Sequence, residues 1–353
     1  MSRFFTQRLA HLEAYTPGEQ PRDMQYTKLN TNESPFPPPQ SVLDAAAREA
    51  ARLNLYCDPA CAELCAAAAR LYGVEPENIM AVNGSDEALY FAYLAFCDDD
   101  RPMAYPDISY SFYPVFSAIS CIPAKPIPLR PDFTIDPRDY WGIGENIVIA
   151  NPNAPTGIAL TPSEIETIVA SNPDNIVIID EAYVDFGAQS CVPLTKKYSN
   201  LLITQTFSKS RSMAGARLGF AIGHADLIAD LNTIRFSTNP YNVNRMTQAA
   251  GVAAIEANEV FMAQCRTIME NRAFTTGALK QLGFTVLPSS ANFVFARHTS
   301  LSGSWLYQAL KARGVLVRHF SRPELEPYLR ITIGTRQQMD TLLDTLKELI
   351  AKE

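Results

Sequence analysis

The sequence lacks several features that would place it at once in a large class of proteins. Its net charge is −7, with 30 Lys and Arg against 37 Asp and Glu, and no basic cluster stands out, so we expect no nucleic-acid partner. No apolar run is long enough to span a bilayer, and the first fifteen residues carry charges in place of a signal-peptide core. We therefore expect a cytoplasmic protein with no membrane partner.

Cysteine is present in an odd number, seven, which does not resemble a disulfide framework. Cys57, Cys61 and Cys65 recur every four residues, a spacing that a helix would gather on one face. A metal site is one interpretation, but no histidine is near and the paired spacing of zinc ligands is missing. We expect these cysteines to be small hydrophobes on the packed side of a helix, and we expect no metal.

The nucleotide-binding motifs are also missing. The phosphate loop G-x-x-x-x-G-K-[ST] does not occur. The segment 141–144 begins like a dinucleotide fingerprint, but Ile147 stands at the third glycine position. These absences argue against nucleotide enzymes of the common α/β types.

What is present is an alternation of short apolar runs and helical patterns, which predicts an α/β fold. The runs at 147–150, 176–179 and 201–204 are typical of strands buried on both faces of a mainly parallel sheet flanked by helices. After about residue 240 a long helical stretch, 243–282, and four further strand candidates indicate a smaller α+β C-terminal domain. We predict an N-terminal arm and linker over 1–40, a large domain over 41–240 and a small domain over 241–353.

Two of the apolar runs lead into residues that can carry chemistry. Asp180 ends one run, and the carboxyl ends of strands are where open α/β sheets bind ligands. Lys209, flanked by serines, follows another run, and a lysine there can form a Schiff base if its pKa is lowered. Ser208 and Arg217 are suited to hold a phosphate. Taken alone, Asp180 could equally be structural, and Lys209 could be a solvated loop residue.

Three other segments are expected at the same edge. Ser85 and Asp86 open a helix after a glycine turn, and exposed N–H groups there suit an anion. Tyr110 lies in an aromatic loop able to stack on a flat ring. Residues 151–157 also follow a strand.

The order of these segments resembles the fold-type I aminotransferases, and within them the histidinol-phosphate aminotransferase family. The resemblance covers nearly the whole chain. It rests on the following segments: Tyr15–Pro21, Lys28–Pro35, Asn83–Glu87, Pro106–Pro114, Asp180–Tyr183, Thr206–Arg211 and Leu329–Gly334.

The resemblance implies that pyridoxal 5'-phosphate is the cofactor, held by Lys209 as a Schiff base, and that residues 41–240 form its binding domain. Lys209 would then act as the proton-transfer base, and Asp180 would pair with the pyridinium nitrogen. Tyr110 would stack on the ring and Tyr183 would contact its 3' oxygen. The phosphate would lie among Ser85, Asp86, Ser208 and Arg217.

The resemblance also implies a homodimer with shared active sites, because Tyr56 matches a tyrosine that reaches the neighbouring subunit's phosphate. Two positions depart from the family. Ala154 stands where many relatives have an asparagine that contacts the 3' oxygen, so Asn153 or, second, Asn151 is expected to supply that amide. Cys57 stands where the family commonly has proline.

Substrate choice is expected to depend on two arginines. Arg330 matches the family's general anion-binding arginine, and Arg318 matches the second phosphate arginine of the histidinol-phosphate enzymes, with Tyr15 and Asn32 lining the same site. The expected reaction is transamination between L-histidinol phosphate and 2-oxoglutarate, giving imidazole-acetol phosphate and glutamate in histidine biosynthesis.

Three alternatives remain open from the sequence. The first is an aminotransferase for aromatic amino acids, and the second is a pyridoxal-phosphate-dependent decarboxylase of a phosphorylated amino acid. The third is a regulatory module that binds the cofactor without turnover. Such regulators carry an additional DNA-binding domain, whereas only about 40 irregular residues precede the core, so we rank this alternative lowest.

Overall fold

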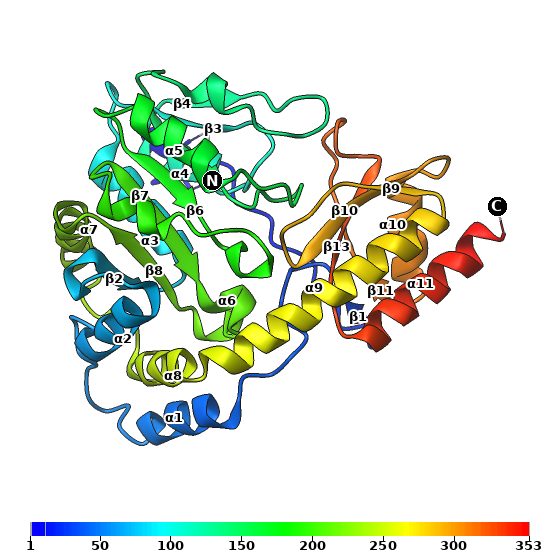
Figure 1. The fold of residues 1–353 in the computed structure, drawn as a ribbon, viewed down its shortest axis with the longest axis horizontal. Coiled ribbons are helices and arrows are strands. Elements are labelled where there is room, and N and C mark those ends of the chain that lie inside the picture. The colour runs from blue at the N-terminus through cyan, green and yellow to red at the C-terminus, as the bar shows by residue number, and fades with distance from the viewer. Residues whose placement is uncertain (1, 11, 353) are drawn as a thin grey trace.

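The computed structural model describes residues 2–10 and 12–352 and is organised around a seven-stranded sheet (Figure 1). The strand order is β2-β8-β7-β6-β5-β3-β4, in which β8 runs antiparallel to both neighbours and the other pairs are parallel. The predicted mainly parallel α/β sheet is therefore confirmed. The strands are β2 (Ile79–Val82), β3 (Met103–Pro106), β4 (Ala124–Ile127), β5 (Asn146–Ala150), β6 (Val177–Asp180), β7 (Leu201–Thr206) and β8 (Gly219–Gly223).

The central strands are apolar on both faces because helices cover both. Every residue of β5, β6 and β7 is buried. Within β5, Ile147 and Ile149 belong to the core on one face and Val148 to the core on the other, as the two-residue period of a strand requires. One face packs on α2 (Ala62–Tyr72), α5 (Pro162–Ser171) and α8 (Arg245–Glu256), and the other on α3 (Ser85–Phe96), α4 (Tyr113–Ser120) and α7 (Ala225–Thr238).

Local sequence explains how helix α5 begins. Thr161 caps α5 and forms a reciprocal capping box with Glu164.

The outermost helix, α1 (Gln40–Ala50), packs on α8. Cys65 lies in α2 and Cys61 directly precedes it, and both are buried in the core, as expected for small hydrophobes; burial raises the pKa of the Cys61 thiol to about 12. Cys57 lies before the helix and is only partly buried, so the three cysteines do not share one helix face.

The smaller domain is built on a four-stranded antiparallel sheet of order β12-β13-β10-β9. Figure 1 shows the long helix α9 running from the large sheet's helices to this smaller sheet. The elements are α9 (Asn258–Gln281), β9 (Phe284–Val286), β10 (Phe293–His298), α10 (Gly303–Ala312), β11 (Val315–Leu316), β12 (Arg318–His319), β13 (Tyr328–Thr332) and α11 (Arg336–Ile350).

The remaining elements are short. β1 (Thr27–Lys28) pairs in parallel with β11, and α6 (Phe207–Ser210) directly follows β7. Single 3₁₀ turns occur at Gln7–Leu9, Pro76–Asn78, Pro137–Tyr140, Val184–Phe186, Val192–Lys196 and Ala214–Ala216. Among the described residues, no helix has both the length and the apolar character needed to cross a membrane.

The N-terminal stretch differs from the expected loose arm. Leu29 is 1% exposed in the small domain's core, and the main-chain N–H of Asn32 donates to Thr332 Oγ1 at 3.0 Å. These contacts join residues about 300 positions apart, so no local pattern could reveal them. Residues 27–32 are therefore part of the packed small domain.

The long helical stretch expected over 243–282 is two helices, because the chain breaks at Ala257 between α8 and α9. α8 packs on α1 and α2, and Ala250 and Ala254 lie in the core of the large sheet. We propose on this basis that the domain division predicted at residue 240 falls after α8.

Candidate active site

The carboxyl ends of the parallel strands meet at one edge of the large sheet, where they enclose a cavity of about 190 Å³. Its lining combines most of the residues that the sequence predicts for a cofactor site. Contributors from the large domain are Ser85, Asp86, Tyr110, Ala154, Asp180, Tyr183, Ser208, Lys209 and Arg217. The fold thus gathers segments spread over more than 130 positions of the chain.

One group of lining residues is suited to bind a phosphate. Ser85 and Asp86 form the first turn of α3, where free N–H groups and the helix dipole favour an anion. The Arg217 guanidinium lies opposite, 3.1 Å from the Asp86 carboxylate and 3.4 Å from Ser208 Oγ. Gly84 has a φ of +78°, a conformation that favours glycine, and the absence of a Cβ there leaves room for that guanidinium.

The lining also includes a buried carboxylate, that of Asp180, which is 4% exposed. It accepts hydrogen bonds of 3.2 Å from the Tyr113 hydroxyl, the Thr204 hydroxyl and the Ala182 N–H, all neutral donors. Burial, together with the charge of Asp86, raises the pKa of Asp180 to about 6. A cationic ring nitrogen placed in this cavity would offset the cost of burying the charge.

Lys209 stands where this cavity meets a second one, and it lines both. Its Nζ donates to the Thr31 carbonyl oxygen at 3.4 Å and lies 6.0 Å from the centre of the Tyr183 ring. The Tyr183 hydroxyl is itself held by the Asn32 amide, which donates to it at 3.0 Å. The amine and the phenol therefore face the same space.

The arrangement matches pyridoxal phosphate in its three functional parts. The lining provides an anion-binding group at the start of α3, a buried carboxylate that has only neutral hydrogen-bond donors, and a lysine. Tyr110 lines the same cavity, and its hydroxyl donates to Asp86 Oδ1 at 2.7 Å. The residues present thus fit the cofactor that the sequence leads us to expect.

The amide expected to contact the ring's 3' oxygen has a different position. Asn153 is 1% exposed and donates to the Ile108 carbonyl and the Thr156 hydroxyl, at 2.9 and 3.2 Å. Asn151 is bonded to the main chain of Leu160. Ala154 lines the cavity instead. Both side-chain protons of Asn153 are engaged by these two acceptors, and Asn153 is not part of the cavity lining.

The second cavity, about 200 Å³, lies next to the first and is lined by both arginines that the sequence singles out. Arg318 of β12 and Arg330 of β13 are directly paired across neighbouring antiparallel strands. Burial lowers the pKa of Arg330, and the nearby charge of Arg318 lowers it further. Its Nη2 donates to the Asn30 carbonyl at 2.9 Å, while its buried Nε has no partner among the described residues. Two adjacent guanidinium groups, one with a free donor, suit an anion.

Tyr15 and Asn32, the remaining predicted substrate residues, also line the second cavity. Several other lining residues were not singled out from the sequence, among them Gly18 and Phe320. Gly18 and Phe320 belong to the same wall, and the Phe320 ring lies 5.5 Å from the Arg318 guanidinium and 5.8 Å from that of Arg330. For Gly18, the only indication in the sequence was that it lies in the segment Tyr15–Pro21, which resembles the family. No motif or resemblance pointed to Phe320.

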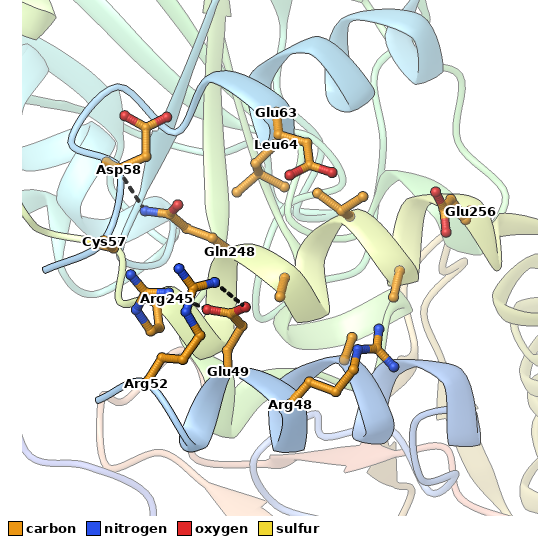
Figure 2. A pocket seen from close by; sticks show the side chains of 14 residues that line it. Arg48, Glu49, Arg52, Cys57, Asp58, Glu63, Leu64, Arg245, Gln248 and Glu256 are labelled. Atoms are coloured by element: carbon orange, nitrogen blue, oxygen red, sulfur yellow. Dashed lines mark hydrogen bonds and ion pairs between the residues drawn. The ribbon is translucent and has the colours of Figure 1, made fainter. Parts of the chain in front are cut away.

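A separate cavity of about 450 Å³ lies beside α1, α2 and α8 (Figure 2). Figure 2 shows Arg245 reaching Glu49 across it; the same guanidinium donates to the Tyr56 carbonyl at 2.8 Å. The catalytic and substrate residues expected from the sequence do not line it. The predicted chemistry is therefore concentrated in the two cavities around Lys209.

The fold and the site together define an aminotransferase of fold type I. The model of the family "Aminotransferase class I and II" matches residues 25–346, so the chain belongs to that family. The enzyme class predicted from the sequence is confirmed.

Similar proteins share the name of one particular aminotransferase. The chain is 47% identical over 352 residues to a histidinol-phosphate aminotransferase of Brachyspira hyodysenteriae, covering 99% of each chain. It is 48% identical over 350 residues to histidinol-phosphate aminotransferase 1 of Bradyrhizobium diazoefficiens, covering 99% of this chain and 100% of that one. The crystal structure of the Sinorhizobium meliloti histidinol-phosphate aminotransferase in complex with pyridoxal-5'-phosphate has a TM-score of 0.85 at 23% identity, covering 93% and 92%. At 23% identity, the likeness to this structure supports the fold alone.

Proposed function

We propose that this enzyme uses pyridoxal phosphate to transfer an amino group between L-histidinol phosphate and 2-oxoglutarate, giving imidazole-acetol phosphate and glutamate. The observation that carries the proposal is the pairing of Arg318 with Arg330 in a cavity that Lys209 shares with the cofactor pocket. The full-length relatives named histidinol-phosphate aminotransferase support the same substrate. The proposed pathway is histidine biosynthesis.

Each part of the first cavity would hold one part of the cofactor. The N–H groups of Ser85 and Asp86, the Ser208 hydroxyl and the Arg217 guanidinium would bind its phosphate. Lys209 would carry it covalently, Tyr110 would stack on its ring and Asp180 would face the ring nitrogen. When bound, pyridoxal phosphate supplies an electron sink that stabilises negative charge at the substrate Cα.

The protein's own groups would perform the proton transfers and set the charges. Lys209 Nζ lines both cavities, so it can take the proton from the substrate Cα and, as its conjugate acid, deliver that proton to the cofactor. The Asp180 carboxylate would fix a positive charge on its partner from within a buried, hydrogen-bonded position, where the interaction is stronger than in water. Asn32 would orient the Tyr183 hydroxyl.

The second cavity would recognise the anionic ends of both substrates. Arg318 and Arg330 can present planar forks to a phosphate or a carboxylate, which a lysine cannot. Phe320, beside both guanidinium groups, limits their hydration. The imidazole of the amino donor would lie near Tyr15, at the outer wall of the same cavity.

The experiment is to incubate the enzyme with histidinol phosphate and 2-oxoglutarate and to measure glutamate. The proposal expects a kcat/KM for histidinol phosphate that is far above that for phenylalanine. A preference for phenylalanine would identify an aromatic aminotransferase, and carbon dioxide release from a phosphorylated amino acid would identify a decarboxylase.

We propose in addition that the enzyme is a cytoplasmic homodimer whose active sites are shared. Tyr56 is 79% exposed and stacks on Tyr241, with ring centres 4.4 Å apart, beside exposed Leu53 and Leu55. An apolar, aromatic surface of this kind is typical of an interface. Tyr56 does not line the cavities around Lys209 of its own subunit, which leaves it free to reach a partner's phosphate.

A further inference from the structure

The segment 15–19 crosses the second cavity and is tied at both ends to different domains. At one end, the Tyr15 ring packs on Phe112, with centroids 4.4 Å apart, and Phe112 directly precedes α4 of the large domain. At the other end, the Glu19 carboxylate accepts hydrogen bonds from the Tyr307 hydroxyl and the Lys311 ammonium of α10, in the small domain. Between them, Gly18 forms part of the cavity wall.

The same segment is also linked to the substrate arginine. The Glu19 carbonyl oxygen accepts from the Asn30 side-chain amide at 2.8 Å, and the Asn30 carbonyl accepts from Arg330 at 2.9 Å. The fit is close, because a Cβ added at Gly18 would lie 2.6 Å from Thr31 Cγ2. A displacement of Glu19 would therefore change the position of Arg330 through Asn30.

We propose that Glu19 is a positioning residue for the phosphorylated amino donor: its contacts with Lys311 and Tyr307 hold residues 15–19 closed over the substrate cavity. This inference rests on the proposed function for the identity of the substrate. The Lys311 hydrogen bond, then the Tyr307 hydrogen bond, keep the pKa of Glu19 below its usual value, so the carboxylate is charged throughout the neutral range.

Electrostatics alone would predict the opposite effect, which makes the idea testable. The Glu19 charge acts on Arg318, one of the two cavity arginines. If Glu19 mattered only through this charge, its removal would leave the cavity more positive and would strengthen phosphate binding. If Glu19 holds the segment closed, its removal weakens binding although the local charge has become more favourable.

The variants are Glu19→Gln, which keeps one hydrogen-bonding group, Glu19→Ala, and the reversed pair Glu19→Lys with Lys311→Glu. We expect KM for histidinol phosphate to rise roughly threefold to tenfold in Glu19→Ala, with a smaller rise in Glu19→Gln and little change in kcat, because the pair is partly exposed and partly screened. The reversed pair should recover most of the loss. A fall in KM, or no rescue by the reversed pair, would overturn the proposal.

A second readout is independent of turnover. Arg22 is exposed just beyond the segment, so trypsin cleavage after Arg22 in the cofactor-loaded enzyme should be faster in Glu19→Ala than in wild type. Lys347→Met is the matched control, because it removes an exposed ion pair with Asp344 on α11, away from both cavities. Unchanged cleavage would overturn the proposal. If wild type does not act on histidinol phosphate, the proposed function fails, and cleavage still decides whether Glu19 closes the segment.

Discussion

The cavity that contains Asp180 is lined mainly by the large sheet and its loops, whereas the cavity that contains Arg318 and Arg330 is assembled from the N-terminal segment, loops of the large domain and the small sheet. In the first, β6 and β7 end side by side, so Asp180 and Lys209 are set by a rigid, fully buried core. In the second, the N-terminal segment, the 109–111 loop and the small sheet each supply a wall.

This difference has a chemical consequence. The cofactor's requirements are the same for every substrate, and the first cavity meets them mainly with groups that are positioned around the large sheet. Recognition of the substrate belongs to a cavity whose walls come from different domains and can shift relative to each other. Substitutions in the first cavity should therefore affect all substrates alike, and substitutions in the second should discriminate among them.

The largest expected effect is in the first cavity. Asp180→Ala removes the carboxylate that would hold the ring nitrogen charged, so kcat/KM should fall roughly 10²–10³-fold or more, of the order seen for other electrostatic deletions. The loss should be equal for histidinol phosphate and for phenylalanine, and some cofactor should still bind. Near-normal turnover, or a loss confined to one donor, would show that Asp180 is structural.

The second-largest effect is expected in the second cavity, where a substitution should affect one substrate more than another. Arg318→Leu should lower kcat/KM for histidinol phosphate. The expected loss of transition-state binding free energy is about 2–4 kcal/mol, the scale for a partly buried charged contact. The loss for phenylalanine should be far smaller. Steady-state kinetics with both donors measures this, and an equal fall for both would mean that Arg318 supports the fold.

A smaller effect concerns stability without cofactor. Burial raises the pKa of Asp180 from 3.8 to about 6, so the folded state binds a proton more tightly than the unfolded chain, and this contribution to stability is lost as the pH rises from about 4 to 6. Asp180→Asn should therefore stabilise the cofactor-free protein at pH 8, by at most about 1–3 kcal/mol, and have little effect at pH 4.

The matched control for that measurement is Glu181, the next residue. Burial raises its pKa to about 7, but its partners are Ser190, Gln205 and the Cys191 N–H, and it does not line the cofactor cavity. Glu181→Gln should stabilise the protein at pH 8 whether or not cofactor is present, whereas the benefit of Asp180→Asn should disappear once cofactor is added. Thermal denaturation with and without pyridoxal phosphate separates the two, and an identical response of both variants would contradict the assignment of Asp180.

The same contrast explains what the sequence could predict. Asp180 and Lys209 were found because buried parallel strands are continuous apolar runs: Asp180 directly follows the run 176–179, and Lys209 lies five residues after the end of the run 201–204. The edge strand β4 was missed because it contains Lys125 and Pro126, which only an edge strand tolerates. β8 was missed because glycines begin and end it.

Contacts between distant segments could not be predicted locally. The burial of residues 27–32 depends on strands near residue 330, and the link from Asn30 to Arg330 spans 300 positions. The orientation of Asn153 is a similar case, because its hydrogen bonds to Ile108 and Thr156 depend on how two loops meet. Only the likeness to a known family indicated that the N-terminal segment belongs to the site.

The measurement that tests the central claim most directly is the identity of the lysine that carries the cofactor. The purified enzyme, loaded with pyridoxal phosphate, is reduced with borohydride and digested, and the peptide that retains the cofactor is sequenced. The structure predicts a single labelled peptide that contains Lys209, and no label in Lys209→Ala, which should also have lost transamination. A label on any other lysine, or full activity in Lys209→Ala, would contradict the assignment of this active site.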